Sequence, residues 1–179
     1  MKHKKRFLTP DYAFDGYKSV SPEFLLSAGL RFIIADIDNT LAPYEQPLPD
    51  GDNLAWFASM DENGIKIALV SNNRSERVEL FNRDAGLTAF ADCRKPSPGF
   101  VKKAMAAIGA YPGATVYIGD QIFTDTLAAR LAGIASIKLP PIRDKKTLLF
   151  RIKRFLEIPV MKKYYRLEKK AGRSGTNGK

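Results

Sequence analysis

A buried strand that ends on two carboxylates constrains this chain more than any other stretch. Residues 32–35 read Phe-Ile-Ile-Ala, an apolar run without alternation, which predicts a strand covered on both faces in a parallel sheet. Asp36 and Asp38 follow at once. If the chain stayed extended, both side chains would lie on one face at the carboxyl end of the strand, where open α/β sheets bind ligands. Alone, such a pair can also be two solvated acids in a turn formed by Asn39 and Thr40.

The chemistry open to this pair is limited by what the rest of the chain lacks. Two like charges this close raise each other's cost of ionisation, and a bound divalent cation is the usual remedy. One carboxylate could then act as nucleophile and the other as general acid or base. His3, the only histidine, lies in the basic N-terminus, so Ser-His-Asp and histidine-rich zinc sites are excluded. A single cysteine, Cys93, excludes an intrachain disulfide and indicates a reducing, cytoplasmic compartment.

Strands and helices are expected to alternate along the chain with short connections. A chain of 179 residues with 45% hydrophobic content is enough for one folded domain. Further strands are predicted at 64–71, 87–91, 114–118 and 134–139, and helices at 23–28, 53–62, 75–84, 97–108 and 124–132, with Ser97 capping its helix. The pattern predicts a Rossmann-like, three-layer, doubly wound α/β fold with a largely parallel sheet. We divide the chain into a lead-in segment (1–29), a domain that carries the candidate site (30–158) and a basic tail (159–179).

Polar residues follow four of these predicted strands. They are Asp36 and Asp38, then Ser71 and Asn72, then Lys95, then Asp120 and Asp125. The carboxyl ends of parallel strands share one edge of a sheet, so these residues should converge there. Each of these residues alone could equally be a turn residue, a helix cap or a solvent-exposed charge. Together, acids with one lysine and one hydroxyl predict a site for a phosphoryl group and a hard cation, with oxygen ligands that suit Mg²⁺.

The same residues resemble the four motifs of the haloacid dehalogenase (HAD) superfamily. Asp-Ile-Asp-Asn-Thr at 36–40, then Ser71, then Lys95-Pro96, then Gly-Asp-Gln-Ile-Phe-Thr-Asp at 119–125 occur in the order of that superfamily. The resemblance covers roughly residues 30–138 and is greatest to the YqeG-type phosphatases of subfamily IIIA. Their mitochondrial relatives dephosphorylate phosphatidylglycerophosphate.

The resemblance implies a role for each site residue. Asp36 would attack phosphorus to form an aspartyl-phosphate, and Asp38 would protonate the leaving alcohol and then activate water. Mg²⁺ would be held by Asp36, the Asp38 backbone carbonyl and Asp120, with Asp125 as a direct or water-mediated ligand. Ser71 and Lys95 would hold the phosphoryl group. The remaining candidates for substrate contact are Thr40 and Asn72. Dehalogenases of this superfamily lack an acid at the second position, so Asp38 favours phosphate ester chemistry.

The spacing of the motifs leaves no room for a large cap domain. Thirty residues separate Thr40 from Ser71, and 23 separate Ser71 from Lys95. One predicted helix and its loops fill each interval. An uncapped site stays open, which suits a macromolecular or membrane-bound substrate better than a small metabolite.

Positive charge is concentrated at the C-terminal end. Residues 138–179 hold 14 Lys and Arg against three acids, a net charge of +11, whereas residues 1–137 carry −1. Residues 144–158 form an amphipathic helical pattern, expected to pack on the sheet with its basic residues in solvent. Pro159 is expected to break or kink it. Residues 160–170 are expected to form an interfacial helix on an anionic membrane, and the end beyond Ala171 is expected to be disordered.

Three functions remain open at this point. The first is a Mg²⁺-dependent phosphatase acting on a phosphomonoester such as the lipid phosphatidylglycerophosphate, at the cytoplasmic face of the membrane. The second is a nucleotide or nucleic-acid phosphatase whose tail binds the polyanion, since the same basic residues would bind nucleic-acid phosphates. The third is a vestigial HAD module that binds RNA or ribosomes. A phosphate-accepting receiver domain fits the acid pair and the Gly-Asp…Asp motif poorly. No apolar run is long enough to cross a membrane, and no secretory signal is present.

Overall fold

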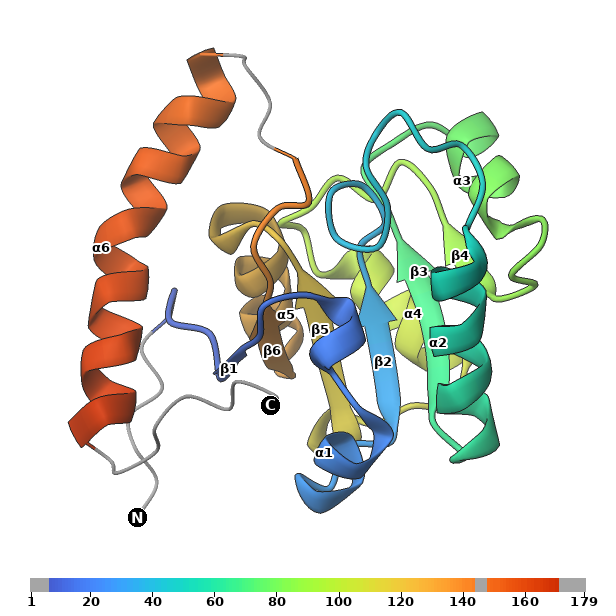
Figure 1. The fold of residues 1–179 in the computed structure, drawn as a ribbon, viewed down its shortest axis with the longest axis horizontal. Helices are drawn as coiled ribbons and strands as arrows, with labels where there is room; N and C mark the ends of the chain where they lie inside the picture. Colours follow the sequence, from blue (N-terminus) through green and yellow to red (C-terminus); the bar gives the residue numbers. More distant parts are fainter. Residues whose placement is uncertain (1–6, 144–147, 171–179) are drawn as a thin grey trace.

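The computed structural model describes residues 7–143 and 148–170, which form one parallel sheet with helices on both faces (Figure 1). The sheet has six strands in the order β1-β6-β5-β2-β3-β4. The bounds are Tyr12–Ala13 for β1, Phe32–Ala35 for β2, Lys66–Val70 for β3, Thr88–Phe90 for β4, Thr115–Gly119 for β5 and Ala135–Lys138 for β6. All strand pairs are parallel, which confirms the predicted α/β class.

The register of the central strands brings their carboxyl ends level. Phe32 of β2 pairs with Lys66 of β3 on one side and with Thr115 of β5 on the other. At the far end, Ala35 pairs with Leu69 and Ile118. The residues that follow these three strands therefore leave the sheet at the same edge.

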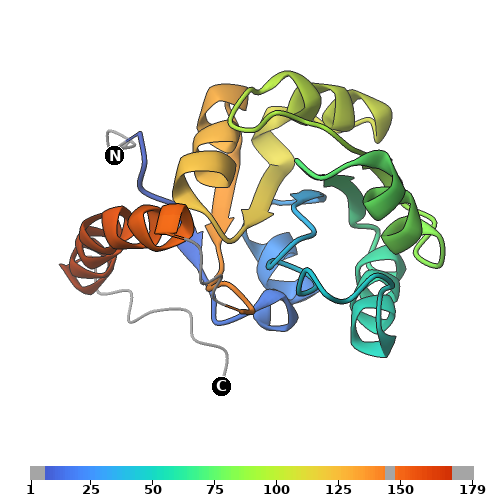
Figure 2. The same ribbon diagram turned by 90° about the horizontal axis from the view of Figure 1, so that it is seen from above.

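Two separate cores hold the helices against the sheet. One lies under α1 (Pro22–Ser27), α2 (Gly51–Glu62) and α3 (Ser75–Asn82). The other lies under α4 (Gly99–Ala107) and α5 (Leu127–Ala132). Figure 2 shows α4 and α5 on one side of the strands and α1 and α2 on the other. Three short helical turns complete these layers: η1 (Tyr17–Ser19), η2 (Pro112–Ala114) and the π-helical turn η3 (Ile122–Thr126).

The last helix, α6 (Leu148–Lys170), stands beside the β1–β6 edge of the sheet (Figure 1). It continues through Pro159 as one helix, so the proline does not end it. Glu157 and Tyr164 are its buried residues among the described side chains. Tyr164 is one of the apolar residues of 160–170, the segment expected to lie on a membrane, but its side chain is buried in the protein. The expectation of disorder beyond Ala171 lies outside the described residues.

Three local features differ from the sequence-based expectations. β1 is unpredicted: with two residues, it is too short to show an apolar pattern, and it forms by pairing with β6. α4 begins at Gly99 with Pro98 at the N-cap position, so Ser97 does not cap it; the Ser97 N–H donates to the Arg94 carbonyl in the preceding turn. The start of the helix predicted at 124–132 is the π-helical η3, and α5 begins only at Leu127.

The segments between the expected motifs hold no inserted cap. Only α2 and β3 lie between Thr40 and Ser71, and only α3 and β4 lie between Ser71 and Lys95. Within the part of the chain that the structure describes, no helix is both long and apolar enough to cross a bilayer.

Candidate active site

The polar residues that follow the strands meet in one cavity at the carboxyl edge of the sheet. The cavity has a volume of about 280 Å³. Five expected residues line it: Asp36, Asp38, Ser71, Asn72 and Lys95. Residues from β2, β3 and the segment after β4 thus share one small polar cavity, as the parallel sheet predicts. Tyr44, Asn73, Gln121 and Thr124 complete its lining.

Three aspartates form a compact acidic cluster at this cavity. Asp36, Asp120 and Asp125 each offer a carboxylate oxygen, and these oxygens all lie within 4.8 Å of one another. All three residues are buried. The Asp120 Oδ1 atom has no hydrogen-bond partner among the described residues. A buried carboxylate oxygen left without a partner is costly, and a hard cation would satisfy it.

Lys95 joins two members of the acidic cluster. Its Nζ atom lies 2.6 Å from Asp36 Oδ1 and 2.9 Å from Asp125 Oδ1. Asn72 positions its backbone, because the Lys95 N–H donates to Asn72 Oδ1 at 2.7 Å and the Asn72 side chain donates to the Lys95 carbonyl at 3.3 Å. The buried ammonium thus neutralises part of the cluster's charge.

Asp38 lies apart from the acidic cluster. The Arg77 guanidinium lies 3.2 Å from Asp38 Oδ1, and Asn73 donates to Asp38 Oδ2 at 3.1 Å. Ser71 makes a longer contact to the same oxygen, at 3.4 Å. The strand has already ended: the N–H groups of residues 40–42 all donate to the Ile37 carbonyl, and Asn39 has a φ of +65°. This turn, rather than an extended chain, separates the two aspartates.

Thr40 does not line the cavity. It is buried within the turn, and its Oγ1 atom has no hydrogen-bond partner among the described residues. The structure therefore brings together all the expected site residues except Thr40: five line the cavity, and Asp120 and Asp125 join Asp36 in the acidic cluster, which does not include Asp38.

Comparisons with known proteins identify the family to which this chain belongs. A family model described as HAD-hydrolase-like matches residues 92–139. The chain is also similar to the probable phosphatase YqeG of Bacillus subtilis (strain 168), with 32% identity over 153 residues, or 86% of this chain and 89% of that protein. The chain belongs to the YqeG-type phosphatases of the HAD superfamily. The predicted family and enzyme class are thereby confirmed.

A solved structure supports the same fold. A crystal structure of an uncharacterized protein from Listeria monocytogenes serotype 4b matches with a TM-score of 0.52 and 17% identity, covering 74% of this chain and 99% of that one. At this level of identity, the likeness concerns the fold alone.

Burial and neighbouring charges shift the pKa values of Asp36 and Lys95 in this YqeG-type site in opposite directions. Burial raises the pKa of Asp36 well above its ordinary value, although Lys95 opposes the shift. Burial alone would lower the pKa of Lys95, but Asp125 and Asp36 outweigh it and raise that pKa. Burial, with the Asp125 charge, raises the pKa of Asp120 to about 6. Burial therefore disfavours the charged forms of Asp36 and Asp120 in the absence of a cation, and Lys95 opposes this at both residues.

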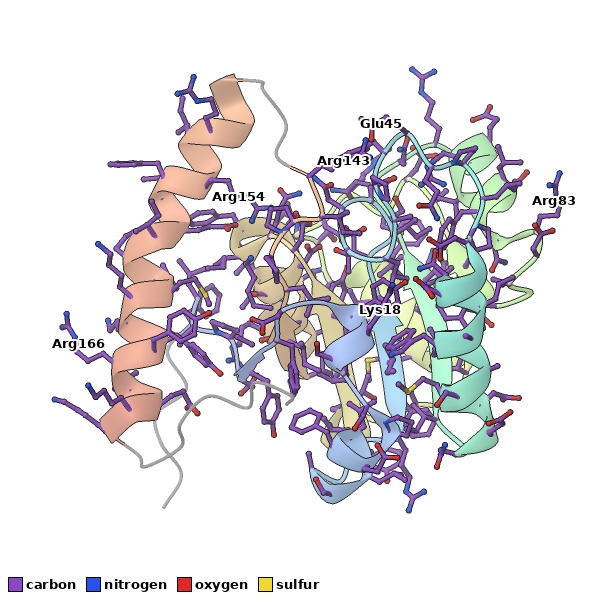
Figure 3. All side chains as sticks on the ribbon, viewed as in Figure 1. Lys18, Glu45, Arg83, Arg143, Arg154 and Arg166 are labelled. Carbon is purple, nitrogen blue, oxygen red and sulfur yellow. The ribbon has the colours of Figure 1, made fainter. Side chains whose placement is uncertain are left out.

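Arg154 of α6 is a contact of the site that sequence reasoning missed. Its guanidinium donates to the Asp120 carbonyl at 2.6 Å and also bonds the Asp120 carboxylate. Figure 3 shows Arg154 between α6 and the body of the protein. In the sequence, Arg154 is one of many basic residues on a predicted solvated face, so no local signal distinguishes it. Asn73, by contrast, adjoins Ser71 and Asn72, and its position at a strand end could have indicated its role.

Gly119, the last residue of β5, leaves room for Asp125. A Cβ atom at this position would lie 2.4 Å from Asp125 Cβ and 2.5 Å from Asp125 Oδ2. Asp125 Oδ2 also accepts the Gln121 N–H at 3.0 Å, which fixes the carboxylate against the strand end. Gly119 is thus part of the geometry of the acidic cluster.

Proposed function

We propose that this phosphatase hydrolyses a phosphomonoester in a Mg²⁺-dependent reaction through an aspartyl-phosphate, on a membrane lipid phosphate such as phosphatidylglycerophosphate. The observation that carries the proposal is that Asp36 and Lys95 line one polar cavity, with Asp120 and Asp125 clustered around Asp36 beside it. The cavity, of about 280 Å³, has room for a phosphoryl group, and no inserted cap covers it, so a large substrate can extend out of it.

The donor set of the acidic cluster fits a hard divalent cation. Asp36, Asp120 and Asp125, with the Asp38 backbone carbonyl, supply oxygen atoms only, which are the ligands that Mg²⁺ prefers. Asp120 Oδ1 has no hydrogen-bond partner in the part of the chain that the structure describes, and this is the strongest single indication that the cluster binds a cation. When bound, Mg²⁺ would act as a Lewis acid that stabilises charge on the phosphoryl oxygens.

In the first chemical step, Asp36 is the nucleophile and Asp38 is the general acid. An Asp36 carboxylate oxygen forms a bond to phosphorus as the phosphorus–oxygen ester bond breaks, and the departing alkoxide takes the proton of the Asp38 carboxyl group. The Lys95 ammonium, 2.6 Å from Asp36 Oδ1, opposes the rise in the Asp36 pKa that burial causes, and so favours the carboxylate that attacks. For this step Asp38 must carry a proton and leave its contact with Arg77.

The second step releases phosphate and restores the enzyme. Water attacks phosphorus, Asp38 accepts its proton, and the bond between phosphorus and Asp36 breaks to return the carboxylate. The contacts of Asp38 with Arg77 and Asn73 hold its carboxyl group at the cavity, where it can accept this proton. Ser71 and Lys95 are placed to donate hydrogen bonds to the phosphoryl oxygens.

A membrane-borne substrate is supported by the open cavity and by α6. The exposed basic residues of its C-terminal half are Lys162, Lys163, Arg166, Lys169 and Lys170. Each basic residue near an anionic bilayer contributes about 1 kcal/mol of attraction. Because Tyr164 packs inward, we assign the membrane contact to these side chains and to exposed apolar residues such as Leu167, rather than to the whole apolar stripe. The proposed site of action is the cytoplasmic face of the membrane.

The decisive experiment is phosphate release from vesicles that contain phosphatidylglycerophosphate, measured with Mg²⁺ and with EDTA. We expect turnover only with the cation. Asp36→Asn should lower kcat/KM by at least about 10³-fold, because the amide is no nucleophile towards phosphorus. The matched control is Asp61→Asn, an exposed aspartate on α2, which should keep wild-type turnover. Wild-type turnover by Asp36→Asn would refute the nucleophile assignment.

A parallel panel separates the alternatives. The basic C-terminal region also favours a nucleic-acid substrate, so oligonucleotides with a 5′- or 3′-phosphate belong in the same assay. Faster turnover of these than of vesicle-borne lipid would replace the lipid assignment and leave the aspartyl-phosphate mechanism intact. Tight RNA binding without turnover of any phosphoester would instead support the vestigial module.

A further inference from the structure

A second and larger cavity lies outside the candidate active site, in a groove between α6 and the β1–β6 edge of the sheet. Its volume is about 1120 Å³, four times that of the polar cavity. One wall is formed by Ala13 and Phe14 at β1 and by residues 139–141 after β6. The other wall is formed by one flank of α6. We call this the α6 groove. Its volume is at the upper end of what small-ligand sites offer.

The α6 groove is lined by apolar side chains that the fold leaves uncovered. Phe155 is 71% exposed, Ile158 47% and Tyr165 57%, and all three lie on the groove flank of α6. Single exposed apolar residues are ordinary, but a contiguous group lining a cavity marks a binding surface. The facing wall contributes Leu139 and two prolines, so both sides of the groove offer apolar contact.

Arg154 connects the α6 groove to the acidic cluster. It lines the groove and at the same time bonds the carbonyl and carboxylate of Asp120. Figure 3 shows it directed from the helix towards the body, whereas Arg166 points outward. One side chain thus separates an apolar groove from the residues expected to hold the phosphoryl group. A molecule with a phosphate at one end and a hydrocarbon chain at the other would match both.

The charges at the groove favour an anionic amphiphile over a purely apolar ligand. Arg151 and Lys162 line the groove, both are exposed, and neither forms an ion pair with another described residue. A nucleic acid would use these cations but would gain little from Phe155 and Ile158. An anionic phospholipid would use both.

We propose that the α6 groove holds an acyl chain of an anionic phospholipid, so that the headgroup phosphate reaches the cavity at Asp36. The proposal rests on the lipid substrate proposed above, and adds that the enzyme binds the hydrocarbon chain itself rather than only the membrane surface. Recognition then depends on chain length, and α6 acts as part of the substrate site.

The test compares two double variants on the same helix. Phe155→Ser with Ile158→Ser removes apolar side chains from the groove. Ile152→Ser with Leu156→Ser is the matched control, because these residues are similarly exposed but do not line the groove. The substrates are dioleoyl phosphatidylglycerophosphate in vesicles and the chainless glycerol 3-phosphate. We expect the ratio of kcat/KM between the long-chain and chainless substrates to fall at least tenfold in the groove variant and to stay at the wild-type value in the control.

A binding measurement keeps this inference separate from the proposed function. Pyrenedecanoic acid, an anionic amphiphile without a phosphomonoester, should bind the wild-type protein, and its Kd should rise at least tenfold in the groove variant alone. If pyrenedecanoic acid binds as expected while lipid phosphate is not hydrolysed, the groove is confirmed as a binding site for an anionic amphiphile and the proposed lipid substrate is refuted. If lipid phosphate is hydrolysed but the two double variants behave alike in both assays, the groove inference is overturned.

Discussion

The charges buried at the cavity leave the acidic cluster short of one cation. Asp36, Asp120 and Asp125 contribute three negative charges once ionised, and Lys95 and Arg154 supply two positive ones. A phosphomonoester brings further negative charge to the same place. Since buried like charges repel strongly, an additional cation would ease the approach of the substrate. The individual side chains therefore favour the binding of a divalent cation at this site.

A substitution at Gly119 tests the geometry of the acidic cluster, because it adds one carbon atom beside Asp125. Gly119→Ala should displace the Asp125 carboxylate, because the added Cβ would lie 2.4 Å from Asp125 Cβ. We expect a loss of about 1–3 kcal/mol in the free energy of unfolding and weaker Mg²⁺ binding. Urea denaturation and calorimetric titration of Mg²⁺ measure the two effects. Gly51→Ala on α2, where a Cβ meets nothing within 4 Å, is the control and should change neither.

The elements show what local sequence can and cannot predict. β2 has the predicted bounds, because an apolar run bordered by charged residues defines a buried strand without help from the rest of the chain. The convergence of Asp36, Ser71, Lys95 and Asp120 was likewise predictable, since parallel strands share a carboxyl edge. These features depend on local pattern and one topological rule.

Features created by contacts between distant segments were not predictable. β1 is a strand only because β6 lies beside it, and its two residues carry no pattern of their own. α6 passes through Pro159, although proline usually ends a helix, because Glu157 and Tyr164 are packed on either side of it. The bond from Arg154 to Asp120 spans 34 residues and follows from this packing.

Glu157 fastens α6 to the rest of the protein. Its carboxylate accepts the Ile122 N–H at 2.7 Å and an Arg154 N–H at 2.8 Å, and lies 3.8 Å from Lys138 Nζ. Burial lowers the pKa of Lys138, and Glu157 opposes that shift. The helix thereby depends on one buried anion that faces several donors.

Removal of this anion should release the helix. We expect Glu157→Ala to cost about 3–5 kcal/mol, because Lys138, Arg154 and the Ile122 N–H lose a buried partner. Glu168→Ala, on the same helix, should stay within about 0.5 kcal/mol of wild type. Chemical denaturation gives the free energies, and hydrogen exchange of α6 shows where protection is lost. Equal effects of the two variants would contradict the role given to Glu157.

For the molecule as a whole, stability should depend on pH and on the cation together. In the metal-free protein the folded pKa of Asp120 is about 6, above the ordinary 3.8. The folded state therefore loses stability as the pH rises from the ordinary value of 3.8 to about 6, and the loss stays constant at higher pH. Mg²⁺ binds the ionised form and should offset this loss, by about 2.7 kcal/mol at a concentration 100 times Kd.

Denaturation across this pH range, in EDTA and in Mg²⁺, measures both effects. The matched variant is Asp120→Asn, which cannot ionise, so the stability of wild type relative to the variant should fall with rising pH in EDTA. In Mg²⁺ that fall should be reduced or reversed. A difference between the two proteins that stays constant with pH in EDTA would refute the assigned cause.

The pairing of β1 with β6 sets the order in which this protein can be completed during synthesis. Asp11 contacts Ser136 across 125 residues of sequence. β1 is the first strand to be synthesised, but it can pair only after β6, the last strand, has left the ribosome. Such distant pairing is slow to form. The α6 groove, which takes a wall from β1 and another from the last helix, is consequently among the final parts of the protein to exist.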